Sequence, residues 1–335
     1  MSQIVSVQRH LLATQSNHPD ATGDLTALLW DLTLAFKLIN AEVNKAGLVN
    51  LYGLDGDRNA SGDDVTKLDR FSQDTIFRMM DHGGHLCCMA SEEEREIIRI
   101  PAEYPKGKYV LSYDPLDGSS NIDANVSVGT IFAIHHRVTP EGTDGTEADV
   151  LQPGSALVAA GYVVYGSSTM LVLSTGDRVD GFTLDPSVGE FLLSHPNIRI
   201  PSRGAIYSVN EGNENFWDAN TRRYVQWVKS GGPGAYKARY IGSMIADVHR
   251  TLLYGGIFLY PRTFRKDPAN GECKLRLLYE AGPMGWIVER AGGIASTGER
   301  PIVDLVPTHL HERCPVAIGS PDDVAEYLAF YRGER

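Results

Sequence analysis

The sequence predicts a layered α/β fold in which helices alternate with mixed β-sheets. Segments with apolar residues at helical spacing and segments rich in β-branched and aromatic residues follow one another along the chain. They lack the strict strand–helix–strand rhythm that builds a purely parallel sheet. The 335 residues also exceed the length over which one hydrophobic core usually keeps growing. We therefore expect two tightly packed domains, residues 1–198 and 199–335, divided where prolines and a glycine gather in 195–204.

The elements of the N-terminal half follow from local patterns. Apolar residues keep helical spacing from Asp24 up to Gly47, which predicts a long amphipathic helix. Residues 51–64 are polar and contain glycines, and we expect them to form a long mobile loop. A second helix is predicted from Asp69 to Asp81. Strands are predicted over residues 85–91, 108–114 and 129–138, and a β-hairpin is predicted over residues 170–185.

The C-terminal half shows similar patterns. A helix is expected over residues 243–253, followed by a strand at 256–261. Another helix is predicted over 275–290, because two glycines shortly after it would end it. The last helix is expected to begin at Ser320, where the sequence Ser-Pro-Asp-Asp is similar to a capping box.

The composition is that of a globular enzyme. Apolar residues make up 42% of the chain, and the net charge is −11 with a pI near 5.4. A nucleic-acid partner would need a basic face, so none is expected. The N-terminus lacks the pattern of a signal peptide, and no apolar run approaches the ~20 residues of a membrane span. We expect no membrane partner and a cytoplasmic location.

Cysteine usage predicts reduced, partly buried thiols at Cys87, Cys88, Cys273 and Cys314.

The stretch DPLDGSS, residues 114–120, carries the clearest chemical signal. It follows a predicted strand, so Asp114 and Asp117 can face one small volume. Two carboxylates this close repel one another unless a cation lies between them, and hard oxygen ligands suit Mg²⁺ or Mn²⁺. Gly118, Ser119 and Ser120 then offer backbone N–H groups and hydroxyls at an expected helix start, where a phosphate can bind. The sequence therefore predicts a metal site next to a phosphate site.

A second acidic cluster supports this prediction. Glu92 and Glu93 in SEEEREI leave a predicted strand end as Asp114 does. A glutamate-rich run is usually a solvated helix start. Parallel neighbouring strands would instead bring the two acidic ends together.

These residues carry a resemblance to a known family. The segments SEEE, GKYVLSYDPLDGSSNID, ARYIGSMIADVHRTLLYGGIFLYP and KLRLLYE resemble class I fructose-1,6-bisphosphatase, a Mg²⁺-dependent sugar phosphatase of the inositol-monophosphatase superfamily. The resemblance covers nearly the whole chain, whereas the motif D-P-L-D-G alone would indicate only the superfamily. It implies hydrolysis of fructose 1,6-bisphosphate to fructose 6-phosphate in gluconeogenesis, by a cytoplasmic homotetramer with Mg²⁺ or Mn²⁺ as cofactor. The N-terminal domain would be allosteric and the C-terminal domain would bind substrate.

The resemblance also implies roles for individual residues. It places the metal ligands at Glu92, Glu93, Asp114, the Leu116 carbonyl, Asp117 and Glu280. It assigns activation of the attacking water to Asp63, Asp69 and Glu93. It implies that the sugar and its two phosphates contact Asp117, Gly118, Ser119, Ser120, Asn210, Asn213, Arg239, Tyr240, Met244, Tyr260, Lys274 and Arg276. Arg239 would reach in from a neighbouring subunit. Asn213 stands where the family often has a tyrosine, so its contact with the 6-phosphate is weaker.

An allosteric AMP site is implied near the first long helix. Its residues would be Thr22, Gly23, Asp24, Leu25, Thr26, Lys108 and Tyr109. A helix N-terminus offers free N–H groups to a phosphate, although Thr22 or Asp24 could instead cap those groups in an ordinary way. His136 stands where the family commonly has an arginine that contacts the nucleotide, and Arg137 faces the opposite side of its strand. We therefore expect AMP to inhibit, but more weakly than in relatives with the arginine.

Alternatives to this function remain. A sedoheptulose bisphosphatase or an inositol-type phosphatase would share the metal carboxylates, while Arg239, Tyr240 and Tyr260 favour a hexose with a second phosphate. A non-catalytic regulatory scaffold of the same fold would be expected to lose a metal ligand or a water-activating acid, and none is lost. Thioredoxin control is not expected, because the segment RVTPEGTDGTEADVLQPG contains no cysteine.

Overall fold

The computed structural model describes residues 4–15, 22–46, 48, 53–59, 64–232 and 234–335. The α-helices in these ranges are α1 (Val7–Gln15), α2 (Asp24–Val43), α3 (Lys67–Met80), α4 (Glu147–Val150), α5 (Ala219–Lys229), α6 (Met244–Tyr254), α7 (Gly282–Arg290) and α8 (Pro321–Tyr331). Short 3₁₀ segments are η1 (Ser119–Ala124), η2 (Gly154–Ala156), η3 (Glu211–Phe216) and η5 (Ile302–Asp304), and η4 (Leu277–Ala281) is a π-helical turn. The strands are β1 (Leu54–Arg58), β2 (Asp64–Thr66), β3 (Leu86–Ser91), β4 (Ile98–Arg99), β5 (Tyr109–Asp117), β6 (Val128–His136), β7 (Leu157–Tyr165), β8 (Thr169–Ser174), β9 (Val179–Asp185), β10 (Glu190–His195), β11 (Ile206–Ser208), β12 (Lys237–Ala238), β13 (Ile257–Tyr260), β14 (Ile294–Ser296) and β15 (Val316–Gly319).

The larger sheet positions the strand ends that carry the acidic motifs. Its strand order is β10-β9-β8-β7-β6-β5-β3-β4, and neighbours are antiparallel except for β3 and β5, which run parallel. The carboxyl ends of β3 and β5 therefore lie side by side, with Ser91 paired to Tyr113. This confirms the expected parallel pairing of the two strands that precede the acidic motifs.

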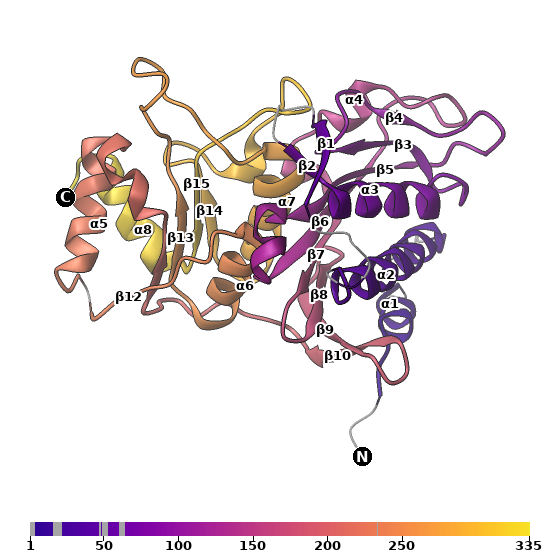
Figure 1. Cartoon of the computed structure of the whole chain (residues 1–335), viewed down its shortest axis with the longest axis horizontal. Coiled ribbons are helices and arrows are strands. Elements are labelled where there is room, and N and C mark those ends of the chain that lie inside the picture. The colour runs from indigo at the N-terminus through magenta and orange to yellow at the C-terminus, as the bar shows by residue number, and fades with distance from the viewer. Residues whose placement is uncertain (1–3, 16–21, 47, 49–52, 60–63, 233) are drawn as a thin grey trace.

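Helices and sheets stack in layers (Figure 1). On one face of the larger sheet lie α1, α2 and α3, while α6 and α7 cover the other face. Successive residues of β6 alternate between the two cores, because Phe132 packs with the first layer and Ile131 with the second. Beyond α6 and α7 lies a five-stranded sheet of order β12-β11-β13-β15-β14, whose outer face packs against α5 and α8. The predicted layered α/β class with mixed sheets is confirmed.

The structure corrects some predicted elements. The described part of the expected loop 51–64 contains β1, which pairs antiparallel with β2. The polar residues of these strands show no apolar alternation from which a strand could be predicted. Backbone hydrogen bonds pair the two strands without it. The predicted second helix begins at Lys67, because Thr66 and Asp69 form a capping box at its start. The helix expected over 275–290 consists of η4 followed by α7.

The capping box expected at Ser320 is wrong, although α8 begins there. Ser320 Oγ accepts a hydrogen bond of 3.0 Å from the Gly256 N–H, and Asp323 accepts one of 2.8 Å from the Gly204 N–H. Both side chains therefore fix neighbouring loops. The four cysteines are free thiols, as expected. Among the described helices, none has the length and apolar character needed to cross a membrane.

Candidate active site

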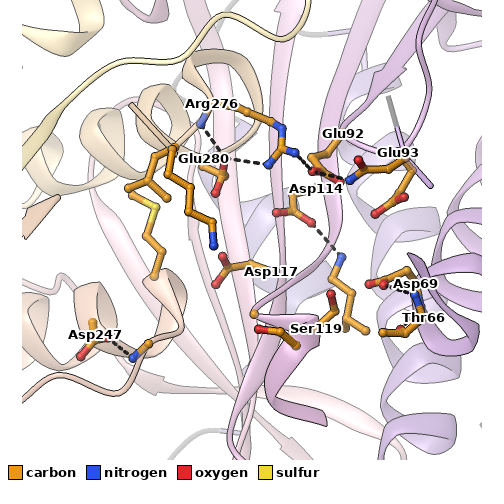
Figure 2. Close-up of a pocket in the computed structure, with 18 of the residues that line it drawn as sticks. Thr66, Asp69, Glu92, Glu93, Asp114, Asp117, Ser119, Asp247, Arg276 and Glu280 are labelled. Atoms are coloured by element: carbon orange, nitrogen blue, oxygen red, sulfur yellow. Dashed lines mark hydrogen bonds and ion pairs between the residues drawn. The ribbon is translucent and has the colours of Figure 1, made fainter. Parts of the chain in front are cut away.

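A cavity of about 480 Å³ opens where the ends of β3 and β5 meet α6 and the segment before α7 (Figure 2). It gathers most of the residues that the sequence predicts for metal, water and substrate. Those that line it are Asp69, Glu92, Glu93, Asp114, Leu116, Asp117, Gly118, Ser119, Ser120, Tyr240, Met244, Tyr260, Lys274, Arg276 and Glu280. Residues more than 160 positions apart in the sequence thus share one site.

An irregularity in β5 brings the two aspartates of DPLDGSS together. β5 continues through Pro115, and its pairing with β6 shifts between Asp114, opposite Ile131, and Asp117, opposite Gly129. Residues three apart on a regular strand face opposite sides, and one extra residue restores the same side. The strand then turns at Gly118, whose φ of 79° is the left-handed conformation that glycine adopts freely. A Cβ there would lie 2.9 Å from the Ser243 side chain, so the backbone approach also requires glycine.

The second acidic pair lies on the turn after β3. The Glu92 N–H donates to the Tyr113 carbonyl at 3.1 Å, which holds the turn beside β5. Asn59 Nδ2 donates to Glu92 Oε1 at 3.0 Å. The same oxygen of Glu92 forms an ion pair with Arg276, so this glutamate already links the N-terminal strands to the C-terminal part of the chain (Figure 2).

The third carboxylate of the cluster comes from η4. Glu280 Oε2 accepts a hydrogen bond of 2.6 Å from the Arg276 N–H and lies 3.7 Å from Arg276 Nη1. One carboxylate oxygen from each of Asp114, Asp117 and Glu280 lies within 4.8 Å of the others. All three side chains are buried. A π-helical turn at this place aims the glutamate into the cavity, and such turns are frequent at functional sites.

Burial and mutual repulsion disfavour the charged form of these carboxylates. Burial, followed by the charge of Glu92, raises the pKa of Asp114 well above its usual value. Burial raises the pKa of Asp117 to about 6 and that of Glu280 to about 7, even though Arg276 lies next to Glu280. A buried set of carboxylate oxygens that repel one another fits a hard divalent cation such as Mg²⁺ or Mn²⁺.

Two acids stand beside this cluster. Burial and the charge of Glu92 raise the pKa of Glu93 to about 10. Asp69 lies at the start of α3, where its Oδ2 accepts from the Thr66 N–H at 2.8 Å. Burial raises the pKa of Asp69 to about 6 against the opposing hydrogen bonds from Thr66 and Ser119. Both side chains can therefore hold or accept a proton near neutral pH.

The substrate side of the cavity is built around the start of α6. Asp247 accepts hydrogen bonds of 3.0 Å from the Ile241 and Gly242 N–H groups and so fixes the loop that carries Tyr240. Met244 and Tyr260 line the same wall of the cavity. Burial raises the pKa of Asp117, and Lys274 contributes a positive charge beside it that offsets a small part of this effect.

Some predicted residues lie elsewhere. Asn210 caps η3 by accepting from the Gly212 N–H at 3.1 Å, and its side chain also hydrogen-bonds to Tyr240. Asn213 lies on η3, outside the cavity lining. Arg239 is exposed, also outside the lining, and donates to the Ala238 carbonyl at 2.8 Å. Asp63 lies outside the described residues.

Sequence reasoning missed several residues of the site, among them Thr66, Asp247 and Asn59. Thr66 could have been found, because Thr-Lys-Leu-Asp has the spacing of a capping box. Asp247 lies in the first turn of a helix whose neighbouring residues form an apolar face. This buried acid accepts a hydrogen bond from the Gly242 N–H and so holds the loop before the helix. Asn59 gave no local signal, because it reaches Glu92 through tertiary structure alone.

A second cavity, of about 500 Å³, lies between the start of α2 and β5–β6. Of the predicted AMP residues, those that line it are Thr22, Gly23, Leu25, Thr26, Lys108 and Tyr109. Lys108 Nζ lies 2.9 Å from Asp24 Oδ2 and 2.6 Å from Thr22 Oγ1. Gly23 is the N-cap of α2 with φ 91°, and no side chain caps the helix.

His136 also lines this second cavity. Its ring stacks on Tyr109 with the centroids 4.9 Å apart. Burial, followed by the charge of Lys108, lowers the pKa of His136. The neighbouring Arg137 points away, as predicted, and donates to Thr139 and Thr143.

The layered fold and the carboxylate cavity define a metal-dependent sugar phosphatase. Residues 5–196 match the family model "Fructose-1-6-bisphosphatase, N-terminal domain", and residues 200–332 match the corresponding C-terminal domain. The chain belongs to the fructose-1,6-bisphosphatase family, and the resemblance found in the sequence is confirmed.

Individual relatives agree with this membership. A class 1 fructose-1,6-bisphosphatase of Chloroherpeton thalassium is 51% identical over 100% of this chain and 95% of its own length. The cytosolic fructose-1,6-bisphosphatase of Arabidopsis thaliana is 51% identical over 99% of this chain and 96% of its own. The holo crystal structure of Leishmania major fructose-1,6-bisphosphatase superimposes with a TM-score of 0.91 and 41% identity, covering 99% of this chain and 100% of that one.

Proposed function

We propose that this chain hydrolyses the 1-phosphate of D-fructose 1,6-bisphosphate, giving fructose 6-phosphate and phosphate. The observation that carries the proposal is the set of buried carboxylates from β3, β5 and η4 that meets Lys274, Arg276 and the turn at Gly118 in one cavity. The relatives named above have this activity in their names. The reaction fits a place in gluconeogenesis.

We assign the cations to the acidic residues of the cavity. Glu92, Glu93, Asp114, Asp117, Glu280 and the Leu116 carbonyl would hold Mg²⁺ or Mn²⁺. When bound, the cations supply an activated water and neutralise charge on the transferring phosphoryl group. Glu93 and Asp69 lie beside the metal-binding carboxylates in the same cavity, and with the cations bound they would accept the proton of the attacking water. Asp63 would assist them.

The remaining residues would orient the sugar. Lys274 and Arg276 line the cavity beside the carboxylates, where they would contact the sugar and the phosphate being cleaved. The turn at Gly118, Ser119 and Ser120 offers donors to that same phosphate. The 6-phosphate and the ring would contact residues on and around the α6 side of the cavity, with Asn213 in a weaker role: Asn210, Asn213, Tyr240, Met244 and Tyr260.

We also infer a homotetramer of two-domain subunits. Residues 1–198 would form the allosteric domain, which carries most metal ligands, and 199–335 the substrate domain. The exposed position of Arg239, outside its own cavity lining, suits a residue that completes a neighbour's site. Light scattering at assay concentration tests the assembly, and a fully active monomer would contradict it. The name of the Arabidopsis relative supports a cytoplasmic location.

AMP is the proposed allosteric inhibitor. The second cavity joins an uncapped helix N-terminus to Lys108 and an aromatic ring, Tyr109, and these groups suit a nucleoside monophosphate. The N-cap residue is Gly23, and no side-chain capping hydrogen bond is found there among the described residues, which supports this proposal over an ordinary cap by Thr22 or Asp24.

A substrate panel tests the activity. Phosphate release should be measured from fructose 1,6-bisphosphate, sedoheptulose 1,7-bisphosphate and inositol 1-phosphate, each with Mg²⁺ and with excess EDTA. We expect the first to be hydrolysed with the highest kcat/KM, and only with metal. Preference for either other substrate would point to the paralogous phosphatases. No hydrolysis of any substrate would favour a regulatory scaffold of this fold.

A further inference from the structure

The turn that carries Glu92 and Glu93 is held from both sides. On the N-terminal side, the Glu94 N–H donates to the Ser91 carbonyl at 3.3 Å, and Ser91 Oγ bonds to Gln73 at 2.6 Å. These contacts anchor the base of the turn to β3 and α3. They leave the exit of the turn, at the Glu94 carbonyl, to be fixed by another part of the chain.

His311 supplies that contact. Its Nε2 lies 2.9 Å from the Glu94 carbonyl oxygen, 217 residues away in the sequence. A carbonyl only accepts, so Nε2 carries the hydrogen and the imidazole is the donor. The ring also packs against Tyr279, the residue that precedes Glu280 in the sequence, with centroids 5.5 Å apart.

The segment around His311 is itself fixed to the substrate side of the cavity. Arg313 forms a β-bridge with Arg276. The Leu277 N–H donates to the Glu312 carbonyl at 2.7 Å, and the Cys314 N–H donates to the Leu275 carbonyl at 3.0 Å. His311 therefore reaches the acidic turn from the segment that runs beside Arg276.

We propose that His311 is a positioning residue for metal binding, which sets the Glu92–Glu93 turn at the correct distance from Glu280. The inference rests on the metal ligands proposed above. Glu92 sits on this short turn, and its charge repels those of Asp114 and Glu280. A turn whose exit is not anchored would therefore relax outward. His311 opposes this movement without touching metal or substrate.

A matched pair of variants isolates the hydrogen bond. His311→Met keeps a side chain of similar length against Tyr279 but removes the donor, whereas His311→Gln keeps an N–H group. His309→Ala is the control, because His309 is exposed and its side chain makes no hydrogen bond with any described residue. Mn²⁺ binding to each full-length protein is measured by electron paramagnetic resonance, which needs no activity. The Mg²⁺ concentration for half-maximal activity and the KM at saturating Mg²⁺ are measured beside it.

Loss of a residue that orients a metal ligand typically weakens metal affinity about 10- to 100-fold. We expect about a tenfold loss of Mn²⁺ affinity in His311→Met, with the KM for fructose 1,6-bisphosphate at saturating Mg²⁺ changed by less than about twofold. His311→Gln should recover most of the affinity, and His309→Ala should match the parent.

Three outcomes would overturn the proposal. One is unchanged Mn²⁺ affinity in His311→Met, and another is an equal loss in the Gln and Met variants. The third is a lower melting temperature with a raised KM but intact metal affinity, which would show a merely structural role. A parent enzyme that is fully active in excess EDTA would instead contradict the metal sites themselves.

Discussion

The backbone N–H of Ile245 donates a hydrogen bond of 2.9 Å to Asp117 Oδ2, which joins the start of α6 to the end of β5. Ser243 Oγ donates to the same oxygen at 3.2 Å. Asp117 therefore has two tasks, since one carboxylate both faces the acidic cluster and fixes the substrate side of the cavity to the metal side. These two tasks can be separated by mutation.

Asp117→Asn should inactivate the enzyme while stabilising its metal-free form. The amide oxygen still accepts from Ile245, but the negative charge is lost, and we expect kcat/KM to fall at least ~10²-fold because metal ions stabilise charge by several kcal/mol. Burial raises the pKa of Asp117 from 3.8 to about 6, so removing this charge should add roughly 1–3 kcal/mol to the free energy of unfolding at pH 8 without metal.

Steady-state kinetics and urea unfolding in EDTA check both parts of this prediction. Ser243→Ala, which removes one donor and leaves the charge, is the control and should lack the stabilisation. If Asp117→Asn is no more stable than the parent in EDTA, the charge of Asp117 does not destabilise the metal-free folded protein.

The metal-free protein should lose stability as the pH rises from about 4 to about 7. In the folded state the pKa values of Asp69 and Asp117 are about 6 and that of Glu280 is about 7, against ordinary values of 3.8 and 4.5. At these three carboxyl groups the folded protein therefore binds more protons than the unfolded chain, which lowers the free energy of unfolding as the pH rises. Buried His135 and His249, whose pKa burial lowers to about 4, oppose part of this slope. Mg²⁺ should restore stability most strongly at the upper end.

Urea unfolding at several pH values, with EDTA or with Mg²⁺, measures this dependence. Asp69→Asn should flatten part of the slope, and Asp144→Asn, an exposed acid outside the cavity lining, should leave it unchanged. A slope that is unchanged in Asp69→Asn would refute the raised pKa of Asp69.

Glu93→Gln should lower turnover strongly. The amide cannot accept a proton, and loss of a general base costs at least ~10²-fold in kcat. The next residue provides the control, because the side chain of Glu94 is not part of the main cavity lining and Glu94→Gln should stay near the parent. Turnover is measured at saturating Mg²⁺ and substrate. Near-normal kcat in Glu93→Gln would remove this residue from the mechanism.

His136→Arg should strengthen inhibition by AMP. The histidine stacks on Tyr109 inside the second cavity, and burial together with Lys108 lowers its pKa, so it carries little charge near neutral pH. A guanidinium there would add a charge-assisted hydrogen bond to the nucleotide, worth roughly 1.5–3 kcal/mol or one to two decades in affinity. Inhibition should be non-competitive with substrate.

AMP dose–response curves at saturating substrate compare the parent with His136→Arg. Val138→Arg adds the same charge on an exposed residue outside the cavity and should not change the curve. Equal inhibition of the parent and His136→Arg would show that residue 136 does not contact the nucleotide. No inhibition of any variant would remove AMP from the proposal.

Helices and strands could be predicted from the sequence where the residue types and spacing within the segment already indicate its secondary structure. The helix that begins at Asp24 was predicted correctly because its apolar residues recur at helical spacing. The strand before Asp114 was predicted correctly from its aromatic and β-branched residues. The pairing of β1 with β2 was missed, since its polar residues show no apolar alternation. Strand β7 was also missed. Like β5 it is buried almost throughout and lacks the alternation of a half-exposed strand, but no acidic motif follows it.

The sequence by itself determined which chemistry is present. Asp114, Asp117 and Gly118 lie close along the chain, so their residue types and spacing already predict a metal and phosphate site. Only the tertiary structure decided how that site is completed. The bulge in β5 turns both aspartates to one side, and the approach of η4 brings in Glu280. Likewise, His311 meets Glu94 only after two distant segments pack together, because a contact across 217 residues leaves no local pattern in the chain.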